Sequence, residues 1–162
     1  MTLPVDRESF VEFLLDAKRH TYAAGGGASA AVVAPLLPGS HQLDYSDGPF
    51  FYRDVYYGGA YFVGQETVYY EQQPVWSMVY AGGFTTAVQS GEEEGRIGAF
   101  LQAAMRQVTP QRPYRGPDEL RQPPYIYTDE THGDLARFWG LETITREGVL
   151  VYDLRYQGGV LR

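Results

Sequence analysis

The stretch FVGQETVYYEQQPVWSMVYAGGFT, residues 62–85, returns without a gap as FWGLETITREGVLVYDLRYQGGVL, residues 138–161. Nine of the 24 aligned positions are identical, whereas unrelated segments would share about one or two. This internal repeat predicts two related halves within a single domain of residues 1–162, facing each other across a pseudo-two-fold axis. The first half covers about residues 5–89 and the second about residues 90–162. The identical pairs are Phe62/Phe138, Gly64/Gly140, Glu66/Glu142, Thr67/Thr143, Glu71/Glu147, Val75/Val151, Tyr80/Tyr156, Gly82/Gly158 and Gly83/Gly159.

Length and composition indicate a β-rich globular domain. The 162 residues are enough to bury one core. Aromatic residues make up 15% of the chain, and 14 of them are Tyr. Aromatic side chains favour pleated sheets, and the 19 Gly and 10 Pro residues indicate many turns.

Charge and residue types argue against several classes of function. A net charge of −7 disfavours direct nucleic acid binding, because proteins that bind nucleic acids present basic surfaces. The absence of Cys excludes disulfides and thiol chemistry. The three His residues form no metal-binding motif, so neither a metal nor a cofactor is expected. No signal peptide and no membrane-spanning run is recognised, which favours a cytoplasmic protein without membrane contact.

Hydrophobic periodicity predicts two helices. The first covers residues 5–20, with Asp6 as its cap and Lys18 on its polar face. The second begins at Ser90, which forms an S-x-x-E capping box with Glu93. The Pro-rich segment 112–124 that follows this helix reads as a loop, and its three Arg residues suggest either an anion site or a solvated surface.

Period-two alternation predicts antiparallel strands after each helix, and residues 129–134 read as a polar turn. We therefore expect an α+β fold of duplicated helix-plus-antiparallel-strands units with pseudo-two-fold symmetry, in which the helices pack on the antiparallel sheet. The expected strands cover residues 42–45, 50–57, 60–70, 75–81, 125–128, 135–146 and 149–156.

Alternation along the strands also predicts which side chains face inward. One face of the last strand in each half carries large apolar side chains: Trp76, Met78 and Tyr80 in the first, and Tyr152, Leu154 and Tyr156 in the second.

Glu66 and Glu142 lie among apolar neighbours in the preceding strands, each two residues after a Gly that leaves space beside it. A carboxylate on an apolar face is costly unless it is paired or used. The functional interpretation is a cleft containing one or both Glu residues. The structural interpretation is that each Glu pairs with an Arg, accepts hydrogen bonds from Tyr hydroxyls or reaches solvent.

Several motifs together resemble a bacterial domain family of unknown function. They are D-Y-x-D-G-x-F-F-Y-x-D-x-Y-x-G-G at residues 44–59, F-x-G-Q-E-x-V at 62–68, P-V-W-x-M-x-Y-x-G-G at 74–83 and V-Y-x-L-R-Y-x-G-G at 151–159. Members of that family often follow an Xre-type helix-turn-helix domain. The present chain shows no such domain, so the resemblance implies a free-standing member, or one whose DNA-binding partner is a separate protein, with a sensory or effector-binding role.

Three functional hypotheses follow, and no catalytic residue is assigned because the chain contains no complete catalytic motif. The first is a small-molecule-binding domain with an aromatic and acidic pocket that favours a cationic or planar ligand. The second, less favoured, is a hydrolase or lyase that uses Glu66 with Glu142, or Asp54 with Glu66, as an acid/base pair. The third is a structural or protein-interaction module, for example a homodimer formed through an exposed strand edge. The predicted ligand-binding residues are Glu66, Glu142, Trp76, Tyr80, Tyr152, Tyr156 and Asp54.

Overall fold

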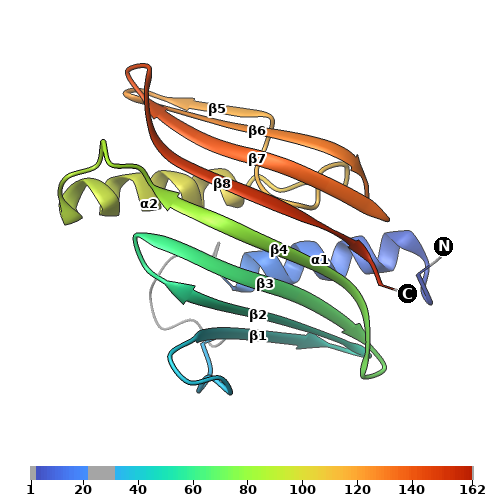
Figure 1. The fold of residues 1–162 in the computed structure, drawn as a ribbon. Coiled ribbons are helices and arrows are strands. Elements are labelled where there is room, and N and C mark those ends of the chain that lie inside the picture. The colour runs from blue at the N-terminus through green and yellow to red at the C-terminus, as the bar shows by residue number, and fades with distance from the viewer. Residues whose placement is uncertain (1–2, 22–31, 162) are drawn as a thin grey trace.

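A computed structural model describes residues 3–21 and 32–161, with about half of the chain in strands and about a fifth in helices. One antiparallel sheet has the strand order β1-β2-β3-β4-β8-β7-β6-β5 (Figure 1). Two helices accompany it, α1 (Arg7–His20) and α2 (Gly91–Met105). The strands are β1 (His41–Asp47), β2 (Phe50–Gly58), β3 (Tyr61–Tyr70), β4 (Gln73–Phe84), β5 (Glu119–Gln122), β6 (Tyr125–Asp134), β7 (Arg137–Arg146) and β8 (Val149–Val160).

The expected fold class, in which duplicated helix-plus-strands units each pack a helix on their own strands, is wrong. The protein is mostly one continuous eight-stranded antiparallel sheet, and its two helices are short. The sheet is continuous because β4 and β8 pair with each other along most of their lengths, from Trp76 opposite Val160 to Phe84 opposite Tyr152. Strand pairing between segments this far apart leaves no local pattern in the sequence.

Both helices begin where their caps predict. The Asp6 side chain accepts a hydrogen bond from the Ser9 amide at 2.9 Å, directly before α1. The Ser90 side chain does the same for the Glu93 amide at 3.3 Å, directly before α2. These contacts satisfy amide groups that have no partner inside a helix.

Two expected loops are partly strand. Residues 129–134, predicted as a polar turn, continue β6, and their neighbours on β7 run from Glu142 opposite Asp129 to Arg137 opposite Asp134. The Pro-rich segment 112–124 contains the edge strand β5. Cross-strand hydrogen bonds therefore outweigh the local turn preference of these polar residues.

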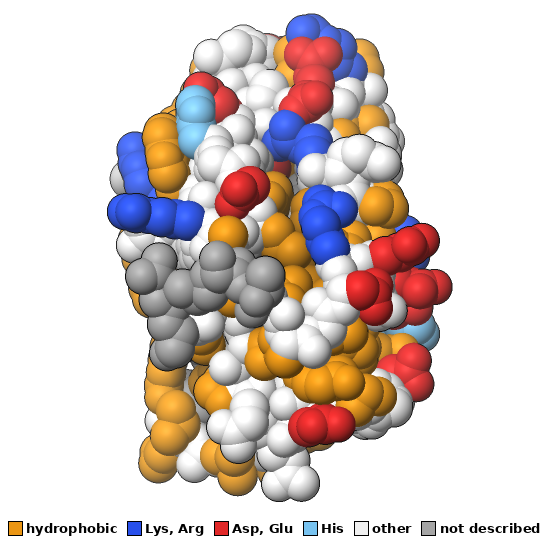
Figure 2. Space-filling model, turned by 90° about the vertical axis from the view of Figure 1, so that its right-hand side faces the viewer, with side chains coloured by type: hydrophobic (Ala, Val, Ile, Leu, Met, Phe, Trp, Pro, Cys, Tyr) orange, Lys and Arg blue, Asp and Glu red, His pale blue; other side chains and the backbone are white. Residues whose placement is uncertain are grey.

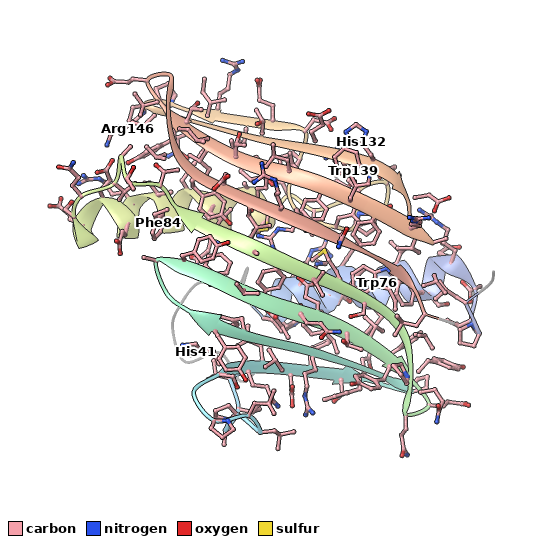
Figure 3. All side chains as sticks on the ribbon, viewed as in Figure 1. His41, Trp76, Phe84, His132, Trp139 and Arg146 are labelled. Carbon is pink, nitrogen blue, oxygen red and sulfur yellow. The ribbon has the colours of Figure 1, made fainter. Side chains whose placement is uncertain are left out.

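The core lies between the sheet and the helices, which occupy the same side of the sheet in Figure 1. Trp76 connects α1 and β7 within this core (Figure 3). Its ring lies 6.2 Å from that of Phe10 on α1 and stacks at 5.6 Å on Phe138 of β7. The inward face predicted for the two long strands is confirmed, because all six of its side chains are buried. They are Trp76, Met78, Tyr80, Tyr152, Leu154 and Tyr156.

The opposite face of the sheet is more exposed. His132 and Trp139 stack there at 4.1 Å, and Trp139 is 55% exposed (Figure 3). Figure 2 views the molecule from the right-hand side of Figure 1, and there acidic and basic side chains are interspersed. Neither described helix has the length and apolar content needed to cross a membrane.

Candidate functional site: a pocket between the sheet and the second helix

Four buried carboxylates lie on the helix-covered face of the sheet, in two cross-strand pairs. Asp54 of β2 is opposite Glu66 of β3, and Asp129 of β6 is opposite Glu142 of β7. None of these four residues is more than 4% exposed. Buried carboxylates require partners, because removing an ionised group from water is costly.

Glu66 is paired with Lys18 of α1. The Lys18 Nζ lies 2.6 Å from Glu66 Oε2, and both side chains are almost completely buried. Lys18 was expected on the polar face of its helix, and that prediction is wrong. Burial lowers the pKa of Lys18, while the neighbouring Glu66 acts in the opposite direction. Among the described residues, the second carboxylate oxygen, Oε1, has no hydrogen-bond partner.

Glu142 is held by a denser set of contacts. Arg115 binds both of its oxygens, with Nε 3.1 Å from Oε2 and Nη2 3.0 Å from Oε1. The hydroxyls of Tyr127 and Tyr152 also donate to Glu142, at 2.7 and 3.0 Å. This arrangement matches the structural interpretation of the sequence, in which the Glu pairs with an Arg and accepts hydrogen bonds from Tyr residues.

Asp129 also has a guanidinium partner. Arg112 Nη2 lies 3.0 Å from Asp129 Oδ2 and 2.8 Å from the Asp129 backbone oxygen, and the Tyr156 hydroxyl donates to Oδ1 at 2.8 Å. Burial and the nearby Glu142 raise the pKa of Asp129 to about 6, although Tyr156 and Arg112 act against this rise.

Asp54 differs from the other three carboxylates. Its carboxylate accepts a hydrogen bond from the Tyr80 hydroxyl at 2.6 Å, and within residues 3–21 and 32–161 no Lys, Arg or His forms an ion pair with it. Burial and the nearby Glu66 raise the pKa of Asp54 to about 7, while Tyr80, Lys18 and Arg115 act against the rise.

Gly64 explains how Tyr80 reaches Asp54 across the intervening strand. Gly64 and Tyr80 are cross-strand neighbours, and a Cβ at position 64 would collide with the Tyr80 phenol. The ring therefore lies over the glycine and spans β3. The space that the sequence suggested beside Glu66 is thus filled by an aromatic side chain. Gly140 accommodates Tyr156 in the same way.

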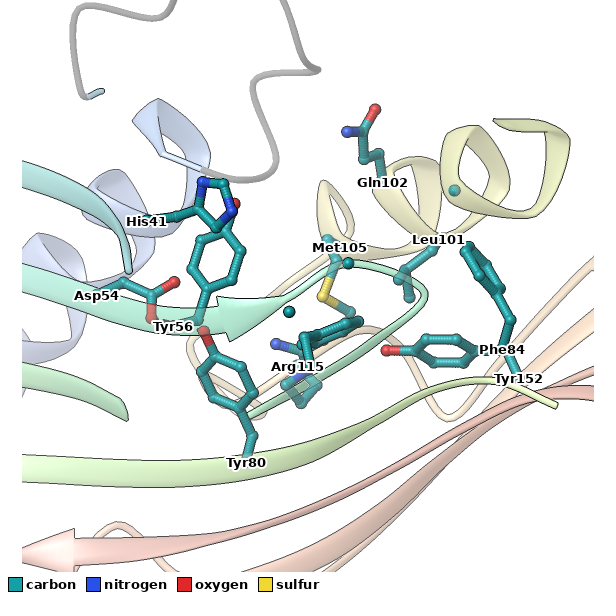
Figure 4. A pocket seen from close by; sticks show the side chains of 14 residues that line it. His41, Asp54, Tyr56, Tyr80, Phe84, Leu101, Gln102, Met105, Arg115 and Tyr152 are labelled. Atoms are coloured by element: carbon teal, nitrogen blue, oxygen red, sulfur yellow. Dashed lines mark hydrogen bonds between the residues drawn. The ribbon is translucent and has the colours of Figure 1, made fainter. Parts of the chain in front are cut away.

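A pocket of about 430 Å³ opens beside Asp54, between the ends of β2, β3 and β4 and the inner face of α2. In Figure 4, Asp54 and Tyr80 lie at one end, Phe84 and Tyr152 lie at the other, and Arg115 lies between them. Its volume is in the range of small-molecule sites. Further aromatic and apolar side chains complete the walls: Tyr56, Phe62, Leu101 and Met105.

Three of the seven residues predicted to bind a ligand line this pocket: Asp54, Tyr80 and Tyr152. The other four do not. Glu66 and Glu142 are held in the buried ion pairs with Lys18 and Arg115. Trp76 lies in the core between Phe10 and Phe138, and Tyr156 is bound to Asp129.

Sequence reasoning missed most of the pocket wall. Arg115 belongs to the Arg-rich loop that was read as an anion site or a solvated surface, yet it is 5% exposed and lies 5.9 Å from the Tyr80 ring. His41 and Gln102 lie at the mouth. The apolar stripe of α2 was a usable signal, because Leu101 and Met105 belong to it, but it also fits ordinary core packing.

The chain belongs to a family described as a domain of unknown function, DUF5680, which matches residues 54–161. No curated protein and no solved structure matches it. Among the described residues, no group of three or more His, Asp or Glu side chains is arranged to hold a metal ion.

Proposed function

We propose that the protein binds a small planar cation in the pocket between the sheet and α2, as an effector-type ligand-binding domain. The observation that carries the proposal is Asp54, a buried carboxylate at the wall of an aromatic pocket with a phenol as its partner. A cation beside Asp54 would offset the cost of ionising it, and the faces of Tyr56 and Phe62 would attract the same charge.

The regulatory part of the proposal depends on sequence resemblance. Related domains that follow Xre-type helix-turn-helix domains suggest that the bound ligand acts as a signal. In the described chain the two helices are separated by four strands, and no helix-turn-helix is formed.

A permanently charged planar probe tests the binding. N-methylquinolinium, whose charge does not change with pH, should bind about tenfold more tightly for each pH unit between 5 and 7, and then level off, as Asp54 ionises. The Asp54→Asn variant should lose this pH dependence. The affinity is measured by titration calorimetry at several pH values. The other charged groups near Asp54 are Lys18, Glu66 and Arg115.

Controls distinguish the effect of Asp54 on binding from the effect of other residues that line the pocket. Histidine side chains in general change charge between pH 5 and 8, and His41 lines the same pocket. If Asp54 causes the pH dependence, the His41→Gln variant should keep it. Neutral 2-naphthol should bind weakly and equally at all pH values. Absence of N-methylquinolinium binding at millimolar concentration, or equal binding to the Asp54→Asn variant at pH 8, would refute the proposal.

A carboxyl that titrates near pH 7 beside Glu66 also suits proton transfer, which favours a hydrolase or lyase as the second candidate. We do not propose Glu66 and Glu142 as the acid/base pair, because their strands, β3 and β7, are three strand spacings apart, roughly 14 Å. Chromatography of each ligand that binds, after incubation with the protein, distinguishes binding from turnover. Only turnover that disappears in Asp54→Asn would support the enzyme.

A further inference from the structure

The environment of Asp54 matches that of Asp129 in three respects and differs in two. Each Asp accepts a hydrogen bond from a Tyr hydroxyl, Tyr80 in one case and Tyr156 in the other. Each is opposite a buried Glu on the adjacent strand. In both places a glycine makes room for the Tyr ring. Asp129 differs in having a cation, Arg112, and in having Thr131 at the register position that Tyr56 occupies beside Asp54.

The contacts around Asp129 show which chemical groups can lie beside a buried carboxylate of this kind. The Arg112 guanidinium contacts Asp129 through both a carboxylate and a backbone oxygen, and it donates to Thr131 at 3.1 Å. Two residues along the chain, the Tyr114 ring packs against Phe138 at 4.3 Å. A guanidinium and an aromatic ring from one short segment therefore occupy this place together.

Beside Asp54, the residue that corresponds to Phe138 is Phe62, which borders the pocket and has the Tyr56 ring 6.4 Å away. Phe62 precedes Glu66 by four residues, as Phe138 precedes Glu142, and Phe62 lines the pocket. The segment that supplies Arg112 and Tyr114 connects α2 to β5. The connection from α1 to β1, residues 21–40, contains no Lys, Arg or His, so it has no cation to offer.

We propose that the pocket takes a guanidinium or amidinium group joined to an aromatic ring, with the cation on Asp54 and the ring against Phe62. This inference rests on the proposed function and names its ligand class. A planar guanidinium fits because its N–H groups can donate to a carboxylate oxygen and to a further acceptor, as Arg112 does at Asp129, and a quaternary ammonium has no N–H to donate.

Three ligands with the same ring test the inference by titration calorimetry at pH 8 on the full chain. Benzylguanidine should bind at least tenfold more tightly than benzyltrimethylammonium, and benzyl alcohol should bind most weakly. In the Asp54→Asn variant, the affinity for benzylguanidine should fall to that for benzyl alcohol. The comparison among ligands needs only the unaltered protein, so it stands even if the variant folds poorly.

The outcomes separate this inference from the proposed function. Equal binding of the two cations, both tighter than the alcohol, overturns the guanidinium preference and leaves the planar-cation proposal in place. Failure of both cations to bind more tightly than the alcohol overturns both proposals.

The Arg112→Ala variant provides an independent readout at Asp129. Ethylguanidinium at about 10 mM should raise its melting temperature more than that of the unaltered protein, because the small cation replaces the missing side chain. Equal shifts in the two proteins would contradict the reading of Asp129 as a guanidinium site.

Discussion

Replacing Asp54 by Asn should stabilise the protein at alkaline pH, although it alters a fully buried polar residue. An unfolded Asp titrates near pH 3.9, whereas burial and Glu66 raise the pKa of Asp54 in the folded protein to about 7. Between these two values the folded state keeps a proton that the unfolded state has lost. The free energy of unfolding contributed by Asp54 therefore falls as pH rises from about 4 to 7, and it is constant above pH 7.

The size of the effect follows from the shift. One pKa unit corresponds to about 1.4 kcal/mol, so a shift of about three units costs about 4 kcal/mol at pH 8. Asparagine is never charged and keeps an oxygen that can accept the hydrogen bond from the Tyr80 hydroxyl. The Asp54→Asn variant should thus be close to the unaltered protein in stability at pH 4.5 and more stable by up to about 4 kcal/mol at pH 8.

Urea denaturation of both proteins between pH 4.5 and 8.5 measures this difference, with the slope against urea checked for constancy. Asp129 also titrates in this range, but it is present in both proteins and cancels in the comparison. A stability difference that does not change with pH would refute the reasoning. So would a variant that becomes less stable relative to the unaltered protein as pH rises, since that would mean that ionised Asp54 is well paired in the folded protein.

Two further predictions concern the buried network. Glu142→Gln should lower the free energy of unfolding by about 3–5 kcal/mol at pH 7, because Arg115 would be left without its buried counter-charge; a loss below about 1 kcal/mol in urea denaturation would contradict this. Gly64→Ala should abolish ligand binding measured by calorimetry, because the new methyl group displaces the Tyr80 ring. Its control, Gly95→Ala, adds a methyl group at an exposed position of α2 that does not line the pocket, with no atom within 4 Å; it should keep ligand binding and gain up to about 1 kcal/mol of stability. Retained affinity in Gly64→Ala would show that the position of Tyr80 does not matter.

The local elements of the fold could be predicted from the sequence because their signals are local. Asp6 and Ser90 fix where the helices begin through hydrogen bonds to amides three residues away. The inward face of β4 and β8 follows from alternation, which depends only on chain geometry. The sequence also identified Glu66 and Glu142 as acids on an apolar face, and both are completely buried.

The partners of those acids could not be predicted, because they come from distant parts of the chain. Lys18 reaches Glu66 from 48 residues away, and Arg115 reaches Glu142 from 27 residues away. Lys18 follows a polar pattern on its helix and is nevertheless buried, since the carboxylate it meets belongs to a strand that the pattern does not describe. Of the predicted acids, Asp54 and not either Glu lines the pocket.

The sequence by itself therefore determined where the helices begin, most of the strands and the inward face of β4 and β8, because these depend on residues a few positions apart. Only the tertiary structure decided that β4 and β8 join the strands into one sheet. It also decided that, among the described residues, three of the four buried acids on the helix-covered face of the sheet have a cation while Asp54 faces a pocket. The physical reason is that the cost of a buried charge is set by whatever surrounds it in space. Those surroundings depend on long-range strand pairing and helix placement, which local periodicity does not encode.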